Sequence, residues 1–197
     1  GGGGAGEVLL NDNLSVTPAE SISISIGNGG SGSVADSDTF PLSRSQAENG
    51  EPTTFGTVTA LGGGAGGSYN PDTTTAHNAA SGGSGGGQIT GSSVATAGVQ
   101  GSFLGWTSYS ANGGLWSTTP VPGGSIAKGG VGGGAKGSAS EPRTGIYLFG
   151  ECLAVGGTGA VRGASIYGSP MAFDPSEHYS AVGCLDADNN QVPGTAG

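Results

Sequence analysis

Runs of glycine recur along most of this chain and limit its fold more than any other feature. Clusters stand at residues 1–6, 27–32, 62–67 and 123–137, and 45 of the 197 residues are glycine, more than three times the usual share of about 7%. Each glycine inside a helix costs about 1 kcal/mol relative to alanine, so long helices are excluded. No strict three-residue glycine repeat persists over a long stretch, which excludes collagen.

Glycine-rich stretches of this kind can adopt an extended left-handed helix with three residues per turn, close to polyproline II geometry. Without side chains, such helices can lie side by side, so that their N–H and C=O groups bond between helices instead of to water. The chain is therefore predicted to replace an apolar core with a hydrogen-bonded lattice. A disordered linker is the alternative that this composition leaves open.

Strand patterns separate the glycine clusters. Residues 21–26 alternate Ser and Ile, which predicts a strand with Ile22, Ile24 and Ile26 on one face. The preceding Thr17-Pro18-Ala19-Glu20 is typical of a turn. Further strands are predicted at residues 53–60, and buried ones at 146–149 and 152–155. The predicted fold class is all-β with glycine-rich, polyproline II-like segments and little or no helix.

The texture of the sequence changes after Pro142, where glycine becomes less frequent. We therefore predict a glycine-rich body over residues 1–142 and a small β tail over residues 143–197. The chain starts at Gly1 without Met, which is expected of a fragment of a longer protein or of a processed product.

Charge excludes two classes of partner. The formal net charge is −9 and only five residues are Lys or Arg, whereas nucleic acid binding requires clustered cations. An anionic membrane surface is disfavoured for the same reason. No run of 18 apolar residues is present, so membrane insertion is not expected.

Catalytic motifs lack the context that chemistry requires. Residues 82–86 (Gly-Gly-Ser-Gly-Gly) match G-x-S-x-G, but a nucleophile elbow needs a strand before it and a helix after it. The histidines His77 and His178 lie in polar loops, where an exposed side chain is the expected role. We expect no enzymatic activity and no cofactor.

Two weaker features remain near the end of the chain. Asp186, Asp188 and Asn190 place oxygen atoms at the spacing that opens many calcium loops, although the turn glycine and a further acidic ligand are missing. A solvated turn is the simpler interpretation, so no metal is expected. Cys152 and Cys184 either form a disulfide or stay as separate buried thiols.

Aromatic residues and one histidine outside the glycine runs are the candidates for contact with a partner. Aromatic rings on loops offer a large contact area at low entropic cost, but they also serve to fill a small core. The candidate contact residues are Tyr69, His77, Trp106, Tyr109 and Trp116.

Three consecutive features resemble a known family. They are the run at 1–7 (GGGGAGE), the segment at 14–27 (LSVTPAESISISIG) and the segment at 54–64 (TFGTVTALGGG). This order is similar to the glycine-rich domains of phage tail-fibre and adhesin proteins. The resemblance is good over residues 1–67 and looser to about residue 137. Ala19 stands where that family usually has glycine, and an acidic insert occupies residues 34–52.

The resemblance implies a non-catalytic virion fibre or adhesin module that recognises a host cell-surface protein or glycan through loops. It also implies a homo-oligomer, contact with other virion proteins and a location on the virion surface, outside the cell. The alternative is a structural subunit of an extracellular fibre, virion shell or decoration that binds its own copies.

Overall fold

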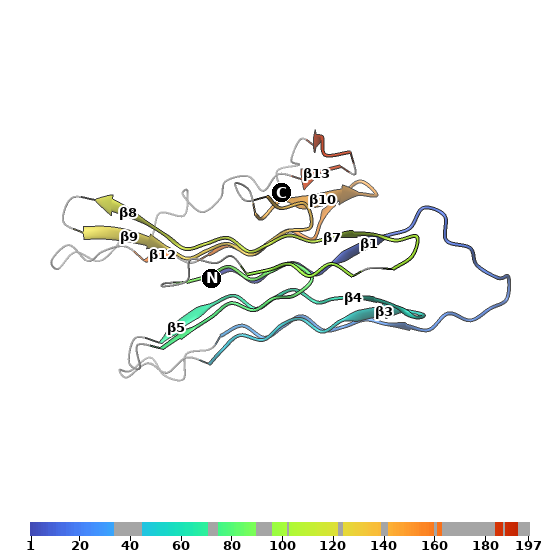
Figure 1. Ribbon diagram of the computed structural model, residues 1–197, viewed down its shortest axis with the longest axis horizontal. Coiled ribbons are helices and arrows are strands. Elements are labelled where there is room, and N and C mark those ends of the chain that lie inside the picture. Colours follow the sequence, from blue (N-terminus) through green and yellow to red (C-terminus); the bar gives the residue numbers. More distant parts are fainter. Residues whose placement is uncertain are drawn as a thin grey trace.

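A computed structural model gives the arrangement of the chain (Figure 1). The structure describes residues 1–33, 45–70, 75–89, 96–101, 103–121, 124–138, 142–159, 161–162, 184–186 and 188–192. This part of the chain contains β-strands and no helix, which confirms the predicted fold class.

Fourteen short strands form five small sheets among the described residues. One sheet pairs β1 (Val8–Leu10) with β7 (Thr107–Tyr109), and another pairs β5 (Ser68–Asn70) with β6 (Thr75–His77). Two three-stranded sheets have the orders β2 (Ile24–Ser25), β3 (Thr53–Phe55), β4 (Val58–Ala60) and β12 (Val161–Arg162), β9 (Gly124–Lys128), β8 (Ser117–Val121).

The remaining sheet has four strands in the order β11 (Glu151–Leu153), β10 (Gly145–Leu148), β13 (Cys184–Leu185), β14 (Gln191–Val192). Its β10 and β13 are parallel, whereas the other strand pairs are antiparallel. In Figure 1 the strands gather toward the two ends of an elongated molecule, and extended glycine-rich segments cross its middle.

Those glycine-rich segments are joined to one another by backbone hydrogen bonds. Segment 1–7 runs antiparallel to segment 61–67, and the N–H groups at positions 1, 4 and 7 donate to the carbonyl oxygens at positions 67, 64 and 61 over 2.6 to 2.9 Å. A second set of donors, at positions 2 and 5, reaches the carbonyl oxygens of positions 130 and 133, each over 2.9 Å. The same segment thus bonds to different neighbours in different directions.

The spacing of these bonds is three residues throughout the middle of the molecule. In segment 82–89 the donors at positions 84 and 87 bond to segment 1–7, and those at 85 and 88 bond to segment 111–114. A repeat of three is the period of a polyproline II helix. The predicted lattice of extended three-fold segments is therefore present.

Glycine is required in the lattice because neighbouring backbones approach so closely. A Cβ atom added to Gly132 would lie within 3.0 Å of backbone atoms of Gly3 and Gly4, a separation that real Cβ atoms essentially never show. Equivalent overlaps with backbone atoms would occur at Gly63, Gly86 and many other lattice positions. These positions require glycine because a side chain would not fit, and not because the backbone has an unusual dihedral angle.

The apolar core is correspondingly small. The buried apolar side chains of the described part are Ala65, Ala111, Ala135, Ile146 and Cys184.

Several polar side chains are buried beside this core and pair internally. The Gln88 amide nitrogen donates to the Thr96 hydroxyl at 2.8 Å, and its oxygen accepts the Ala79 N–H at 3.2 Å. Polar groups buried in this way need such partners, because leaving them unpaired costs about 1–3 kcal/mol each.

Glu7 is a buried carboxylate that ties three segments together, with only 7% of its surface exposed. Its Oε1 accepts the Gly101 N–H at 2.6 Å and the Ser108 hydroxyl, and its Oε2 accepts the Leu61 N–H at 3.1 Å. It sits where segment 1–7 leaves the lattice and enters β1, so it fixes that strand on β7.

The sequence-based strand at residues 21–26 is correct only in its centre. The structure has two strand residues there, Ile24 and Ser25, which pair with β3. Ile22, Ile24 and Ile26 are 39%, 61% and 82% exposed. The alternation was a true strand signal, but β2 is the edge of its sheet, and no described segment covers the isoleucines.

The prediction of buried strands at residues 146–149 and 152–155 was partly wrong. Ile146 is fully buried in β10, but Phe149 is 89% exposed because it lies in the turn between β10 and β11. Leu153 is also partly exposed, at 36%. The hydrophobic runs correctly predicted strands here. They did not predict exposure at the turn, because the backbone conformation decides exposure there.

The predicted turn at Thr17 to Glu20 is present. The Glu20 N–H donates to the Thr17 carbonyl oxygen at 3.1 Å, and Ala19 has φ of 66°. Residues 53–60, predicted as one strand, are instead the hairpin β3–β4 around Gly56, whose φ is 59°. A glycine inside a strand pattern was the available signal for that turn.

Hydrogen bonds cross the position at which we predicted a domain boundary. The Gly157 N–H donates to the Gly3 carbonyl oxygen at 2.8 Å, and the Gly132 N–H donates to the Gly157 carbonyl oxygen at 2.9 Å. Segment 156–159 therefore belongs to the same lattice as the first residues of the chain. The division into 1–142 and 143–197 stays a prediction.

Candidate functional site

Trp106 lies in the turn before β7 and packs against β3. Its ring centroid is 6.4 Å from that of Phe55, with the two planes tilted by 59°. The side chain is half-buried. Part of the ring therefore stabilises the contact between two sheets, and the remainder is available to a partner.

Tyr109, in β7, is also half-buried, and a cation covers one face of its ring. The Lys136 ammonium nitrogen lies 4.5 Å from the ring centroid, and it donates a hydrogen bond to the Asn189 side-chain oxygen at 2.8 Å. Cation–π contact of this kind contributes about 0.5–1 kcal/mol at exposed sites. A sugar could stack on Tyr109 only by the other face or after Lys136 moves.

The other three contact candidates lie on different elements. Trp116 directly precedes β8 and is half-buried. Tyr69 and His77 belong to the hairpin β5–β6, with Tyr69 paired to Ala76 and His77 to Ser68; their side chains fall outside the described part of the structure. In Figure 1, β5 and β8 lie toward the left end and β7 lies in the right half. The five candidates are thus divided between two regions.

Two large apolar side chains at turns are more exposed than these aromatics. Leu104, fully exposed, precedes Gly105 in the turn closed by the Trp106 N–H donating to the Phe103 carbonyl oxygen at 3.0 Å. Phe149, 89% exposed, has φ of 54° and is followed by Gly150 with φ of 88°. Sequence reasoning missed both, although a large residue followed by glycine between strand patterns signals a turn.

Phe149 is held in an unfavourable backbone conformation. A positive φ is uncommon for residues other than glycine and is an outlier for a bulky side chain. Such strain costs on the order of 1–3 kcal/mol and tends to occur at functional sites. Phenylalanine at this position therefore gains little from burial, and the backbone conformation disfavours it.

The Asp186 loop is closed by its own hydrogen bonds. The Asp186 Oδ1 accepts the backbone N–H groups of Asp188 and Asn190 at 2.9 and 2.8 Å, and the Asn190 side-chain amide donates to Oδ2 at 3.0 Å. The pKa of Asp186 is lowered mainly by the hydrogen bond from the Asn190 side chain, then by that from the Asn190 backbone, with smaller contributions from Asp188 and Lys136.

These bonds already engage both carboxylate oxygens of Asp186, the first of the three residues in the calcium interpretation, while Asp188 and Asn190 take part in them only as donors. Among the residues that the structure describes, no group of three or more His, Cys, Asp or Glu side chains is placed to hold a metal ion. The arrangement is that of a turn in which an aspartate caps the following N–H groups.

Ser84, the serine of the G-x-S-x-G match, lies inside the lattice with no exposed surface. Its hydroxyl oxygen accepts the Ala111 N–H at 3.2 Å, and its backbone N–H donates to the Ala5 carbonyl oxygen at 2.8 Å. The hydroxyl is a structural acceptor at a place that a substrate does not reach.

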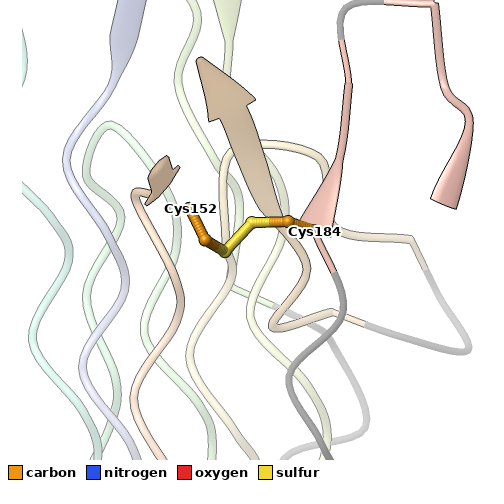
Figure 2. The surroundings of a disulfide bond; sticks show 2 residues. All are labelled: Cys152 and Cys184. Carbon is orange, nitrogen blue, oxygen red and sulfur yellow. A yellow bond between two sulfur atoms is a disulfide. The ribbon is translucent and has the colours of Figure 1, made fainter. Parts of the chain in front are cut away.

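Cys152 and Cys184 form a disulfide between β11 and β13, with their Cα atoms 5.8 Å apart (Figure 2). Since β10 lies between these two strands in the sheet, the bond fastens both neighbours of β10 to each other. Stable disulfides form in oxidising environments, such as outside the cell.

The described part of the chain contains no helix that could span a membrane. Comparison with curated proteins and with solved structures finds no significant match. Comparison with family models finds a match to a glycine-rich domain over residues 1–196. The lattice agrees with that match, since its construction depends on glycine from the first segment to Gly159. The chain therefore belongs to the glycine-rich domain family.

Proposed function

We propose that the chain is a non-catalytic recognition module of a phage tail fibre or similar adhesin. It binds a host cell-surface protein or glycan through turns and loops at an end of the glycine-rich lattice. The module acts on the virion surface, in contact with other virion proteins.

The observation that carries this proposal is the display of Leu104 and Phe149. Both are large apolar side chains at turns, almost wholly exposed, and Phe149 is held at a positive φ. Figure 1 shows the end of β10 and the approach to β7 in the same half of the molecule. Exposed apolar anchors on a rigid support are typical of recognition surfaces, because little entropy is lost when they bind.

The lattice supplies the rigid support. Each segment is bonded to its neighbours every third residue, so the points at which loops leave it are fixed. A scaffold of this kind separates the part that folds from the part that recognises. The partly exposed rings of Trp106 and Trp116 can add contact area beside the apolar anchors.

The test is binding of the labelled chain to cells of the host strain. Replacing both anchors, Leu104→Ser with Phe149→Ser, should weaken binding at least tenfold, because interface anchors of this size contribute about 1–2 kcal/mol or more each. Ile26→Ser is the matched control, since Ile26 is 82% exposed but lies on another segment. Equal binding by the double variant and by the wild-type chain would refute this placement of the contact surface.

A second function, self-assembly into a fibre or shell, is favoured by the exposed row of isoleucines beside β2. An edge strand with exposed apolar side chains is a ready template for pairing with another chain. If the chain is such a subunit, light scattering will show assembly that Ile24→Ser with Ile26→Ser abolishes. A wild-type chain that stays monomeric at high concentration would argue against this function.

A further inference from the structure

A groove lined mostly by glycine runs along the surface of the lattice. Its volume is about 350 Å³, and its walls come from four segments: residues 1–6, 29–33, 47–50 and 63–67. No apolar side chain larger than alanine lines it. Apart from the side chains of Ser31, Ser33 and Glu48, the surface that a ligand would meet there is mainly peptide backbone.

The four segments surround a space instead of lying in a flat row. Segment 1–7 is bonded to segment 61–67, the Gly50 N–H donates to the Gly63 carbonyl oxygen at 2.9 Å, and segment 47–51 is bonded to segment 28–31. The first and last members of this series, 1–7 and 28–31, share no hydrogen bond among the described residues, yet both line the groove. The groove therefore lies between them.

Two backbone donors that line the groove have no acceptor among the described residues. The N–H groups of segment 1–7 point in three directions: positions 1, 4 and 7 bond to one neighbour and positions 2 and 5 to another. The third direction belongs to Gly3 and Gly6, whose N–H groups donate to no acceptor among the described residues. Gly3 and Gly6 both line the groove.

The walls also leave room that the lattice leaves nowhere in its interior. A Cβ atom added to Gly29 or Gly32 would meet nothing within 4 Å, and one added to Gly3 would meet only the Gly64 carbonyl oxygen, at 3.8 Å. At Gly132, by contrast, a Cβ atom would overlap Gly3. Gly3 with Gly6 and Gly29 with Gly32 are each three residues apart, the period of the lattice itself.

We propose that this groove binds one more extended three-fold segment, supplied by a different polypeptide and built on a Gly-Gly-Xaa repeat. The occupant continues the lattice: its carbonyl oxygens accept the N–H groups of Gly3 and Gly6. Two of the three faces of such a helix meet the walls and must be glycine, and the third faces solvent and accepts any residue. This pairing is the polyproline II counterpart of adding a strand to a sheet edge.

The occupant comes from another polypeptide because the glycine-rich runs that line the described lattice are already bonded within it. The segments that line the groove are themselves joined by lattice hydrogen bonds. The occupant would therefore use the same three-residue spacing of hydrogen bonds. The inference does not depend on what the loops at the ends of the molecule recognise.

The test uses a synthetic peptide of five Gly-Gly-Ser repeats. A free peptide of this composition is flexible and loses much entropy on binding, so it is also tethered through a maleimide at Ser33→Cys, on the exposed rim of the groove, to raise its effective concentration. Amide hydrogen exchange, measured by NMR, should slow at least tenfold at Gly3 and Gly6. The matched peptide of Gly-Ala-Ser repeats, tethered in the same way, should give no protection.

Gly29→Val with Gly32→Val is the blocking variant. A Cβ atom at either position meets nothing within 4 Å, so the fold should be retained, which unchanged melting checks. Both positions line the groove, so the valines should obstruct it and protection by the tethered Gly-Gly-Ser peptide should be lost. Unchanged exchange at Gly3 and Gly6 with the tethered peptide would overturn the proposal, as would equal protection by both peptides. Dimerisation of the untethered chain that the blocking variant abolishes would overturn the assignment to a different polypeptide.

Discussion

At the scale of single residues, glycines that look alike in the sequence carry very different structural weight. Gly3 and Gly132 both belong to lattice segments, and they lie against each other. A methyl group on Gly132 would overlap the Gly3 backbone, whereas one on Gly3 would stand 3.8 Å from its nearest neighbour, the Gly64 carbonyl oxygen. The direction in which each Cβ would point decides whether the lattice tolerates it.

Gly132→Ala should therefore lower the free energy of unfolding by about 1–3 kcal/mol, the usual cost of forcing an extra group into a packed interior, or prevent folding. Gly3→Ala should be neutral or stabilising by up to about 1 kcal/mol, because alanine restricts the unfolded chain. Urea denaturation of both variants compares them directly. Similar losses at the two positions would show that the lattice does not pack as described.

Ala19 occupies the third position of its turn with φ of 66°, a conformation that costs an L-residue roughly 1–2 kcal/mol. Ala19→Gly relieves that strain but gives the unfolded chain more freedom, worth about 0.4–1 kcal/mol. The net expectation is a stabilisation of about 0.5–1 kcal/mol in thermal or urea unfolding. Ala19→Val is the opposing control, and it should destabilise. A less stable Ala19→Gly variant would contradict the strain.

The Asp186 carboxyl should titrate below its ordinary pKa of 3.8, because hydrogen bonds to its charged form lower the value. A folded-state pKa below the unfolded one means that the carboxylate adds stability above the unfolded pKa, and that this stability is lost as the pH falls through the folded pKa. NMR of the side-chain carboxyl carbon measures the titration. Asn190→Ala should move the pKa back toward 3.8, and Asp188→Ala, which keeps the backbone N–H, should move it little.

At the scale of elements, the disulfide is the main covalent restraint on the four-stranded sheet. β13 and β14 are two residues each, and β13 pairs with β10 only at Gly145 and Ile146. Strands that short hold poorly by hydrogen bonds alone. The Cys152–Cys184 bond closes a separation of 32 residues, and a loop of that size corresponds to about 3–4 kcal/mol of stabilisation.

Cys152→Ser with Cys184→Ser should therefore reduce stability by about 2–4 kcal/mol. Hydrogen exchange should rise first in β13 and β14, while the amides of segments 1–7 and 61–67 keep their protection. That contrast separates a local restraint from a global one. Equal increases in all segments would show that the sheet and the lattice unfold together.

The elements also show what sequence can predict. The pattern around Ile24 and the pair of runs on either side of Phe149 predicted strands, because alternation and hydrophobicity report extended backbone. Exposure was not predictable from the same pattern, since it depends on which segment covers the strand. The pairing of 1–7 with 61–67 was hidden for a further reason: glycine has no side chain, so nothing in either run specifies its neighbour.

The sequence predicted the class of residue in the candidate site better than it predicted where those residues lie. Large residues outside the glycine runs were the correct class to examine, and Trp106 and Tyr109 do lie near the surface. Their roles could not be read from the sequence, because the contacts with Phe55 and Lys136 join residues far apart in the chain. The hydrophobic run predicts that Phe149 is a core residue, since its positive φ leaves only a faint trace in the sequence, the glycine that follows it.

At the scale of the whole molecule, backbone hydrogen bonds take the place that apolar burial has in most proteins. Few large side chains are buried in the described part. Unfolding should therefore expose an unusually large share of polar surface, which lowers the heat-capacity change, whereas apolar surface raises it.

Differential scanning calorimetry should give a heat-capacity change below about 10 cal/mol/K per residue, compared with about 12–15 for ordinary globular proteins. The stability curve should be correspondingly flat, with little loss of stability on cooling. A value within the ordinary range would mean that apolar burial contributes more than the described residues indicate.

The three-residue spacing of the lattice bonds has a consequence for how such a chain can change. One residue inserted into segment 82–89 would rotate everything after it by a third of a turn, so that donors now facing segment 1–7 would face segment 111–114 instead. Three inserted residues would restore every direction. The lattice segments should therefore tolerate insertions and deletions only in multiples of three residues. The turns at the ends of the lattice can change length by one residue at a time without disturbing it.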